Sequence, residues 1–327
     1  MKKSYLMMAA AAIMFAACTQ ADFVNEVPES APQAIGFENY VAKSTRHMAG
    51  TDMENFHTTF GVFGYNDVDG LFMNNYKTEH GTPVWKYDGL TGGADGATVQ
   101  TLKYWNKNTS YDFYAYAPYN AGVKRDGGTL TIPSGDYAAT QNLQTSFSTD
   151  LNESAFTTDT DWMLAAPKTD VTHASVTDGT VPFVFSHMLS KLVVAVQTTG
   201  DETVEITNLK IKGNTYKTGS YNATDGWTAS NEVTLVGQTG NITTKNTDYY
   251  SMEYLLIPVA TAAPKLDITY KVNDQTYTLT NLAVDNLNAF AAGTYYTLTV
   301  SVGLQPIKFT ATSAVWTTDV NGGVTIE

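Results

Sequence analysis

Residues 294–302 read TYYTLTVSV and predict the class of the fold. Their side chains alternate between two faces, with Tyr296, Leu298, Val300 and Val302 on one face and Tyr295, Thr297, Thr299 and Ser301 on the other. A period of two is typical of a β-strand that buries one face. Tyr, Thr and Val are also residues that favour strands over helices. The segment therefore predicts a β-strand near the end of the chain.

Strand-like runs recur along the chain and are separated by turns that contain Gly, Asn, Asp or Pro. They cover residues 35–45, 60–65, 84–87, 98–105, 111–116, 129–132, 161–166, 181–197, 204–212, 251–257, 266–272 and 275–282. Residues 141–156 are the least strand-like stretch and could hold a short helix. Short strands at regular intervals, with almost no 3.6-residue period, predict an all-β fold built from sandwiches.

The length of 327 residues predicts about two domains at roughly 150 residues each. Hydrophobic residues make up 43% and charged residues 16% of the chain, which is enough apolar material for a core. Residues 168–180 are rich in Thr, Asp and Ser, and we place the domain boundary there. This gives an N-terminal domain over 47–180 and a C-terminal domain over 181–306.

Charge and cysteine content exclude several classes of function. The 32 acidic and 19 basic residues give a net charge of −13, whereas a nucleic-acid-binding protein needs a basic face. The same charge disfavours electrostatic binding to anionic lipid. The one cysteine, Cys18, excludes a disulfide within the chain, a cysteine-rich zinc site and an iron–sulfur cluster.

The N-terminus has the pattern of an export signal. Lys2 and Lys3 precede an apolar run over 5–15, whose eleven residues rise about 16 Å as a helix, well short of a bilayer core of about 30 Å. We therefore predict a signal peptide over 1–18. Residues 15–18, FAAC, resemble the bacterial lipobox, in which the cysteine is acylated after cleavage. Cys18 is thus the predicted lipidation site and only membrane attachment; the alternative is an ordinary signal peptide with an incidental cysteine.

Catalytic and metal-binding motifs are missing from the sequence. It contains no G-x-S-x-G, H-E-x-x-H, P-loop or G-x-G-x-x-G pattern. Residues 67–70, DVDG, fit a turn better than a calcium loop, because Leu71 stands at the third ligand position. The five histidines lack ligand spacing, and His187 in an apolar run is best explained as a hydrogen-bonded core residue. We predict no catalytic, metal or cofactor site and no enzymatic activity.

Two alternatives stay open at this point. Thirty-two carboxylates leave a glycosidase conceivable, although no pair stands out. Trp85, Trp105 and Trp227 could form a platform on which sugars stack, although packing within the sheets is the favoured use.

Residues 181–192, VPFVFSHMLSKL, resemble the F-x-F-x-H-x-L-[SA]-K-L signature of the fimbrillin-like (type V pilin) family. Residues 111–118, YDFYAYAP, are similar to the Y-x-F-x-A-Y-x-P strand of that family. Further matches are the lipobox, the strand over 35–45, FGVFGY over 60–65, DWMLA over 161–165, AGTYY over 292–296, and Trp316. The ordered set spans essentially the whole chain.

The resemblance implies two transthyretin-like β-sandwich domains with Greek-key-like topology, exported as a lipoprotein to the outer membrane. In stalk subunits of the family, an arginine-specific protease removes the first strand, and a strand from a neighbouring subunit fills the groove. Here the tether and removable strand would be residues 19–46, cut between Arg46 and His47. The donor strand would be residues 307–327, with apolar positions at Ile307, Phe309, Val315, Val320, Val324 and Ile326. From the residues alone, this terminal stretch could equally close the second sheet of its own chain.

The favoured function is a structural subunit of a fimbrium that supports cell adhesion at the cell surface. Its expected partners are other fimbrial subunits and the maturation protease, with no nucleic acid. Tip and anchor subunits share these motifs, so the stalk role rests on the donor-like C-terminal stretch. The alternative is an uncut surface lipoprotein that acts as an adhesin and binds host or bacterial surface glycans.

Overall fold

A computed structural model describes residues 32–41, 57–81, 85–126, 128–136, 141–143, 161–237, 239–242, 250–285, 287–304, 308–315 and 324–325. The described residues form strands and one short 3-10 helix, η2 (His173–Ser175), and contain no α-helix. The all-β prediction is confirmed. The stretch 141–156 opens with a strand, β10 (Gln141–Leu143), and its remaining residues lie outside the described ranges.

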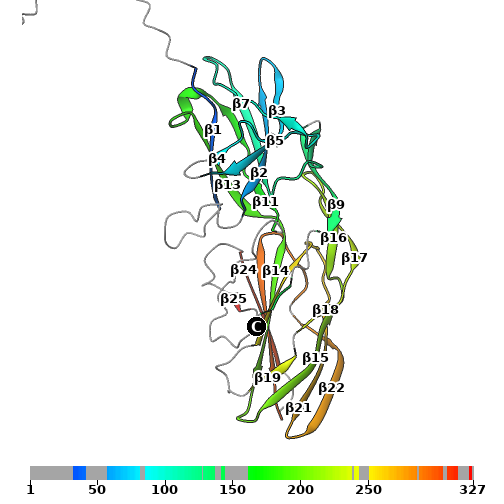
Figure 1. Cartoon of the computed structure of the whole chain (residues 1–327). Coiled ribbons are helices and arrows are strands. Elements are labelled where there is room, and N and C mark those ends of the chain that lie inside the picture. The colour runs from blue at the N-terminus through cyan, green and yellow to red at the C-terminus, as the bar shows by residue number, and fades with distance from the viewer. Residues whose placement is uncertain are drawn as a thin grey trace, which may run out of the picture. The chain divides into compact units, whose positions relative to one another are not determined.

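An eight-stranded sheet takes up most of the N-terminal half of the chain. Its order is β1-β13-β11-β7-β2-β3-β4, and β12 also pairs with β7. The strands are β1 (Gly36–Val41), β2 (Thr59–Asn66), β3 (Gly70–His80), β4 (Trp85–Lys86), β7 (Tyr111–Ala117), β11 (Met163–Ala165), β12 (Lys168–Val171) and β13 (Thr180–His187). All its pairs are antiparallel except β1 with β13, which Figure 1 shows side by side.

Residues 60–63 do not alternate between apolar and polar side chains, because both faces of strand β2 are covered. Phe60 and Val62 lie in one apolar cluster, and Phe63 lies in another on the opposite face. A strand that is covered on both faces needs apolar residues at consecutive positions. The turn at 67–70 follows β2, where the Asn66 side chain accepts hydrogen bonds from two backbone N–H groups, as in an Asx turn.

A four-stranded sheet joins segments from distant parts of the sequence. Its order is β17-β16-β9-β8, made of β8 (Lys124–Asp126), β9 (Thr129–Asp136), β16 (Tyr216–Asn222) and β17 (Gly226–Glu232). The pairing of β9 with β16 links the two halves of the chain by backbone hydrogen bonds. A separate two-stranded sheet holds β5 (Thr91–Gly92) and β6 (Thr98–Val99).

Two further sheets enclose the largest apolar cluster. The six-stranded sheet, ordered β10-β20-β14-β23-β24-β25, contains β14 (Ser190–Thr198), β20 (Tyr250–Leu256), β23 (Thr294–Val302), β24 (Lys308–Val315) and β25 (Val324–Thr325). The five-stranded sheet contains β15 (Val204–Lys212), β18 (Leu235–Val236), β19 (Gly240–Ile242), β21 (Lys265–Val272) and β22 (Gln275–Ala283). The cluster draws side chains from both sheets, which therefore pack face to face.

The strand predicted over 294–302 forms as β23. Its predicted apolar face, Tyr296, Leu298, Val300 and Val302, belongs to the cluster between these two sheets. Its partner β14 runs parallel to it over nine residue pairs, from Ser190↔Thr294 to Thr198↔Val302.

The change from one sheet to the next does not coincide with the domain boundary expected between residues 180 and 181. Strand β13 begins at Thr180 and pairs with β1 and β11, so it belongs to the eight-stranded sheet of the N-terminal half. After His187 the chain enters β14 of the six-stranded sheet, to which the earlier strand β10 also belongs. The Thr, Asp and Ser content of 168–180 marks β12, η2 and the turn before β13, because surface turns favour the same residues as linkers do.

Candidate functional site

The candidate site is the place that the first strand occupies in the eight-stranded sheet. Strand β1 lies at the end of the sheet and pairs in parallel with β13, from Gly36↔Thr180 to Val41↔Phe185. It falls within the strand expected over 35–45. Residues 42–56 lie outside the described ranges, and so do the predicted cleavage residues Arg46 and His47 and the predicted lipidation site Cys18.

Two side chains of this segment lie in the apolar core. Ile35 is 1% exposed and Phe37 is 3% exposed. The Phe37 ring contacts four other rings at centroid distances of 5.7–6.4 Å, those of Phe60, Tyr87, Phe113 and Phe183. Burying two such side chains contributes about 3–6 kcal/mol. The first strand is therefore part of the core rather than a surface addition.

The backbone of the segment is hydrogen-bonded on both sides at its start. Opposite β13, the Ile35 N–H donates to the Lys103 carbonyl at 2.8 Å, and the Trp105 N–H donates to the Gln33 carbonyl at 3.0 Å. The Tyr87 hydroxyl donates to the Ile35 carbonyl at 3.0 Å. Burial raises the pKa of Tyr87 to about 12, so this hydroxyl remains a protonated donor at neutral pH. Residues 33–35 thus lie between the start of β13 and the segment 103–105, with Tyr87 also in contact.

A close approach fixes the register of β1 against β13. A Cβ added at Gly36 would lie 3.0 Å from Thr180 Oγ1, which is tighter than ordinary van der Waals contact. The Gly36 N–H donates to the Gly179 carbonyl, and the Trp105 indole N–H donates to the same carbonyl. A small residue at this point in a strand that replaces β1 would avoid displacing the Thr180 side chain.

The predicted donor stretch is paired within its own chain. Strand β24 runs antiparallel to β23 from Thr294↔Val315 to Ser301↔Lys308, and β25 pairs with β24. Ala311 is buried and Val315 is 75% exposed. Of the six predicted donor positions, Phe309, Val315 and Val324 lie on these strands, while Ile307, Val320 and Ile326 lie outside the described residues. Residues 308–315 thus extend the six-stranded sheet, as one of the two alternatives expected.

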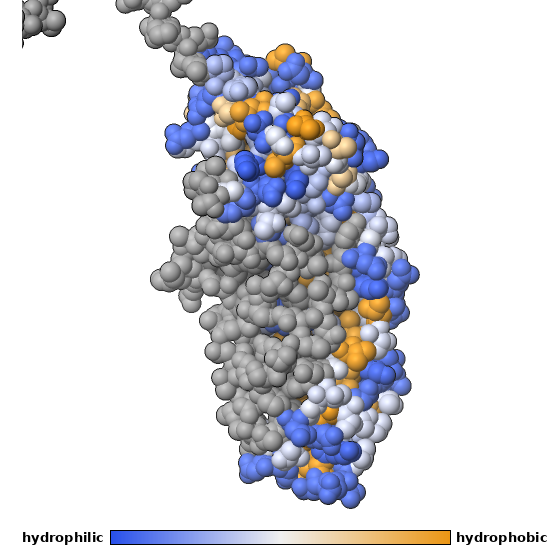
Figure 2. Space-filling model, in the orientation of Figure 1, coloured by the Kyte–Doolittle hydropathy of each residue, from blue (hydrophilic) through white to orange (hydrophobic). Residues whose placement is uncertain are grey.

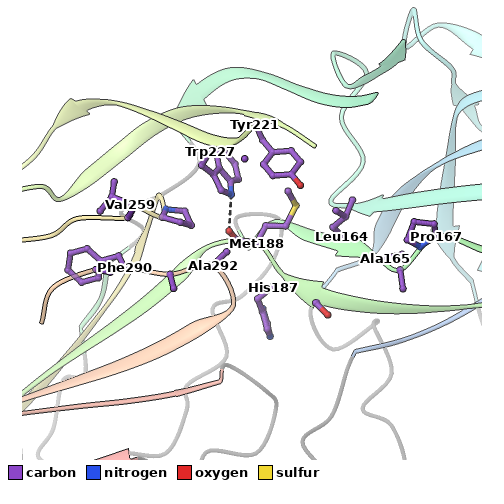
Figure 3. Close-up of a pocket in the computed structure, with 17 residues that line it drawn as sticks. Leu164, Ala165, Pro167, His187, Met188, Tyr221, Trp227, Val259, Phe290 and Ala292 are labelled. Atoms are coloured by element: carbon purple, nitrogen blue, oxygen red, sulfur yellow. Dashed lines mark hydrogen bonds between the residues drawn. The ribbon is translucent and has the colours of Figure 1, made fainter. Parts of the chain in front are cut away.

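A mostly apolar cavity of about 600 Å³ lies where β11, β13, β16 and β17 meet segments 258–260 and 289–292. Figure 3 shows Trp227 and Tyr221 on one side of it, with Met188 and Leu164 nearby. The Trp227 indole N–H donates to the Met188 carbonyl at 2.8 Å. The described residues of the lining include no Asp, Glu, Lys or Arg, and this part of the cavity favours an uncharged group.

The three tryptophans considered as a sugar platform lie in different surroundings. Trp105 is 6% exposed and packs edge-to-face on Tyr111 and Phe113. Trp85 is half-buried, with its ring 4.9 Å from that of Phe60. Trp227 borders the cavity. The packing interpretation is confirmed for Trp85 and Trp105.

Buried polar residues form two pairs, one at the end of β13 and the other between β14 and β20. His187 Nδ1 donates to Asp161 Oδ2 at 2.6 Å, which confirms His187 as a hydrogen-bonded core residue. Lys191 and Glu253 form an ion pair at 3.5 Å with both side chains 2% exposed. The sequence reasoning missed this second pair, whose only signal was a lysine within an apolar run. Among the described residues, no group of three or more His, Cys, Asp or Glu residues could hold a metal.

On the part of the surface that is coloured in Figure 2, hydrophilic residues predominate and hydrophobic residues lie in small groups. No helix within the described ranges is long and apolar enough to span a membrane.

Comparison with known proteins points to one family. The sequence profile of the family described as fimbrillin-like matches residues 45–326. A candidate fimbrium subunit of Bacteroides uniformis is 24% identical over 268 residues, covering 79% of this chain and 80% of the relative.

A solved structure from Bacteroides ovatus shares the fold. A candidate cell adhesion protein from Bacteroides ovatus matches with a TM-score of 0.50 and 18% identity, over 88% of this chain and 98% of the other. Another from Bacteroides uniformis has a TM-score of 0.47 and 19% identity, over 87% and 98% of the two chains.

Proposed function

Because this chain belongs to the fimbrillin-like family, we propose that it is a structural subunit of a fimbrium, assembled at the cell surface by exchange of strands between copies. In this proposal the precursor is exported as a lipoprotein through Cys18. An arginine-specific protease then cuts between Arg46 and His47 and releases the first strand. Residues 307–327 of a neighbouring subunit take its place.

The observation that carries the proposal is the position of Ile35 and Phe37 in the core. Their burial contributes about 3–6 kcal/mol, and each hydrogen bond of the segment adds about 0.5–1.5 kcal/mol. The sum is on the order of 5–10 kcal/mol, which is comparable with the whole stability of a typical domain. Removal of the strand would therefore leave an apolar groove with a strong tendency to bind a replacement.

Proteolysis gives the exchange its direction. While the first strand is attached, it competes with any donor at a very high effective concentration. Cutting after Arg46 removes this competitor, so the groove can bind only strands from other molecules. A head-to-tail exchange of this kind does not close on itself, and it therefore yields a filament.

The donor side of the exchange requires residues 308–315 to leave β23. The side chains described on β24 bury only one small residue, Ala311, and Val315 is exposed. Burial of these described side chains opposes release only weakly, and the eight backbone pairs with β23 that release breaks would be replaced by pairing with the neighbouring subunit.

The test uses purified chain with and without an arginine-specific protease. Cleaved protein should form polymers in electron micrographs, with mature N-termini at His47. Arg46→Ala should block both processing and polymer formation, and deletion of residues 307–327 should block polymer formation alone. Polymers formed by the deletion variant would contradict the strand exchange.

A glycan-binding adhesin is the second candidate, and the cavity beside Trp227 is the feature that favours it. Trp227→Ala should then abolish binding on a glycan array, whereas Trp85→Ala, which changes a ring packed on Phe60, should not. Persistence of the Cys18 N-terminus in the mature protein would support this alternative over a cleaved subunit.

A further inference from the structure

The chain of 327 residues contains two arginines, Arg46 and Arg125. The proposed function requires a protease to cut after the first and to spare the second. A cut after Arg125 would fall within β8 and divide a strand of the four-stranded sheet that links the two halves. The question is what protects Arg125.

Backbone pairing gives only partial protection. Arg125 lies in β8, the end strand of its sheet, where residues 124–126 pair with residues 129–131. Proteases bind their substrates as extended chains, and an end strand already has that form. The arginine side chain must also enter a specificity pocket on the enzyme. Protection therefore depends on where the Arg125 side chain lies.

Two tyrosine rings of the eight-stranded sheet hold that side chain. Arg125 Cζ lies 3.3 Å from the centroid of the Tyr114 ring and 4.8 Å from that of Tyr65. The two rings are 6.1 Å apart and nearly perpendicular. Tyr65 and Tyr114 lie on the adjacent strands β2 and β7, and both are partly buried against the same apolar cluster. The guanidinium is thus held by cation–π contacts with two fixed rings.

The carbonyl of the susceptible bond is also engaged. The Tyr65 hydroxyl donates to the Arg125 carbonyl at 3.3 Å. A serine- or cysteine-type protease must attack this carbonyl and stabilise its oxygen in an oxyanion hole. The same tyrosine therefore contacts both the recognised side chain and the group that would react.

We propose that Tyr65 and Tyr114 form an arginine clamp that withholds Arg125 from an arginine-specific protease and so restricts cleavage to Arg46. This inference rests on the proposed function for its biological meaning, and on the contacts of Arg125 for its mechanism. It assigns to two tyrosines a role in the specificity of maturation.

The test is native digestion of the full chain with an arginine-specific endoprotease, followed by N-terminal sequencing of the products. Wild type should yield a new N-terminus at His47 and none at Asp126. The double variant Tyr65→Ala/Tyr114→Ala should yield the Asp126 terminus at least about tenfold faster, because cleavage follows the population of the released state. Tyr114→Phe keeps the ring and should stay protected.

Two controls separate release of the arginine from general unfolding. Tyr277→Ala removes a ring of β22 that stacks on Tyr270 of β21, and it should leave Arg125 uncut. A lysine-specific protease cutting after Lys124, the exposed neighbour of Arg125, reports on opening of β8 itself. In the double variant, cleavage after Arg125 should rise more than cleavage after Lys124; an equal rise would overturn the clamp.

The clamp and the proposed function fail in different ways. An Asp126 terminus from folded wild type, or an unchanged rate in the double variant, would refute the clamp. Lack of a His47 terminus, with Asp126 produced only by the double variant, would support the clamp and count against maturation at Arg46.

Discussion

Phe37→Ala tests whether the first strand contributes to the core as the structure indicates. The ring is 3% exposed and contacts four aromatic rings, so its loss leaves a cavity lined by side chains that cannot close in fully. Phe→Ala changes of this kind lower the free energy of unfolding by about 3–5 kcal/mol. We expect about 4 kcal/mol for the uncut chain.

The assay is urea unfolding of the uncut chain, monitored by tryptophan fluorescence. Tyr104→Ala is the matched control, because Tyr104 also lies beside the first strand but is 47% exposed, and its loss should change the free energy of unfolding by less than about 1 kcal/mol. Hydrogen exchange should also accelerate at the Ile35 and Gly36 amides, which donate to the Lys103 and Gly179 carbonyls.

The same substitution should have no effect after the strand has been removed. Chain cut after Arg46 no longer contains residue 37 in its main fragment, so variant and wild type should then unfold alike. A loss below 1 kcal/mol in the uncut chain, or a loss equal to that of Tyr104→Ala, would refute the assignment of the first strand to the core.

Three further outcomes follow from other parts of the structure. Lys191→Met should lower the free energy of unfolding by about 3–5 kcal/mol, because it leaves the Glu253 carboxylate buried without its cation, and Lys191→Met/Glu253→Gln should recover part of that loss in the same urea assay. Deletion of residues 307–327 should leave a chain that is folded by circular dichroism and monomeric by size-exclusion chromatography, because among the described side chains of β24 only Ala311 is buried. The hydrogen bond from Lys212 holds the pKa of Asp267 below its ordinary 3.8, so the stabilisation that the ionised carboxylate gives the fold is present above pH 3.8 and is lost as the pH falls further. Asp267→Asn should therefore make the melting temperature depend less on pH in that acid range.

Local patterns predicted what local forces decide. Alternation in 294–302 identified β23 and its buried face, and the Asp and Gly residues of 67–70 identified a turn. The strand-like run over 35–45 identified the first strand, which forms as β1. These features depend on side-chain period and turn chemistry, which neighbouring residues determine.

Long-range pairing was beyond the sequence. The parallel contact of β1 with β13 joins segments about 140 residues apart, and β9 with β16 joins segments about 80 apart. No local pattern specifies such partners, so the sequence did not reveal that β13 pairs with β1 and β11. The buried pair of Lys191 and Glu253 was missed because a charged residue is usually exposed, and its partner lies on another strand.

The direct passage from β13 into β14 has a mechanical consequence for a subunit in a filament. Only Met188 and Leu189 separate the two strands, and both are buried. A pulling force applied at the groove beside β13 would therefore be transmitted along the chain to β14. It would load the nine parallel residue pairs between β14 and β23 along the strand direction. Hydrogen bonds loaded in shear must rupture together rather than peel apart singly, which would make this connection resistant to pulling by flowing liquid.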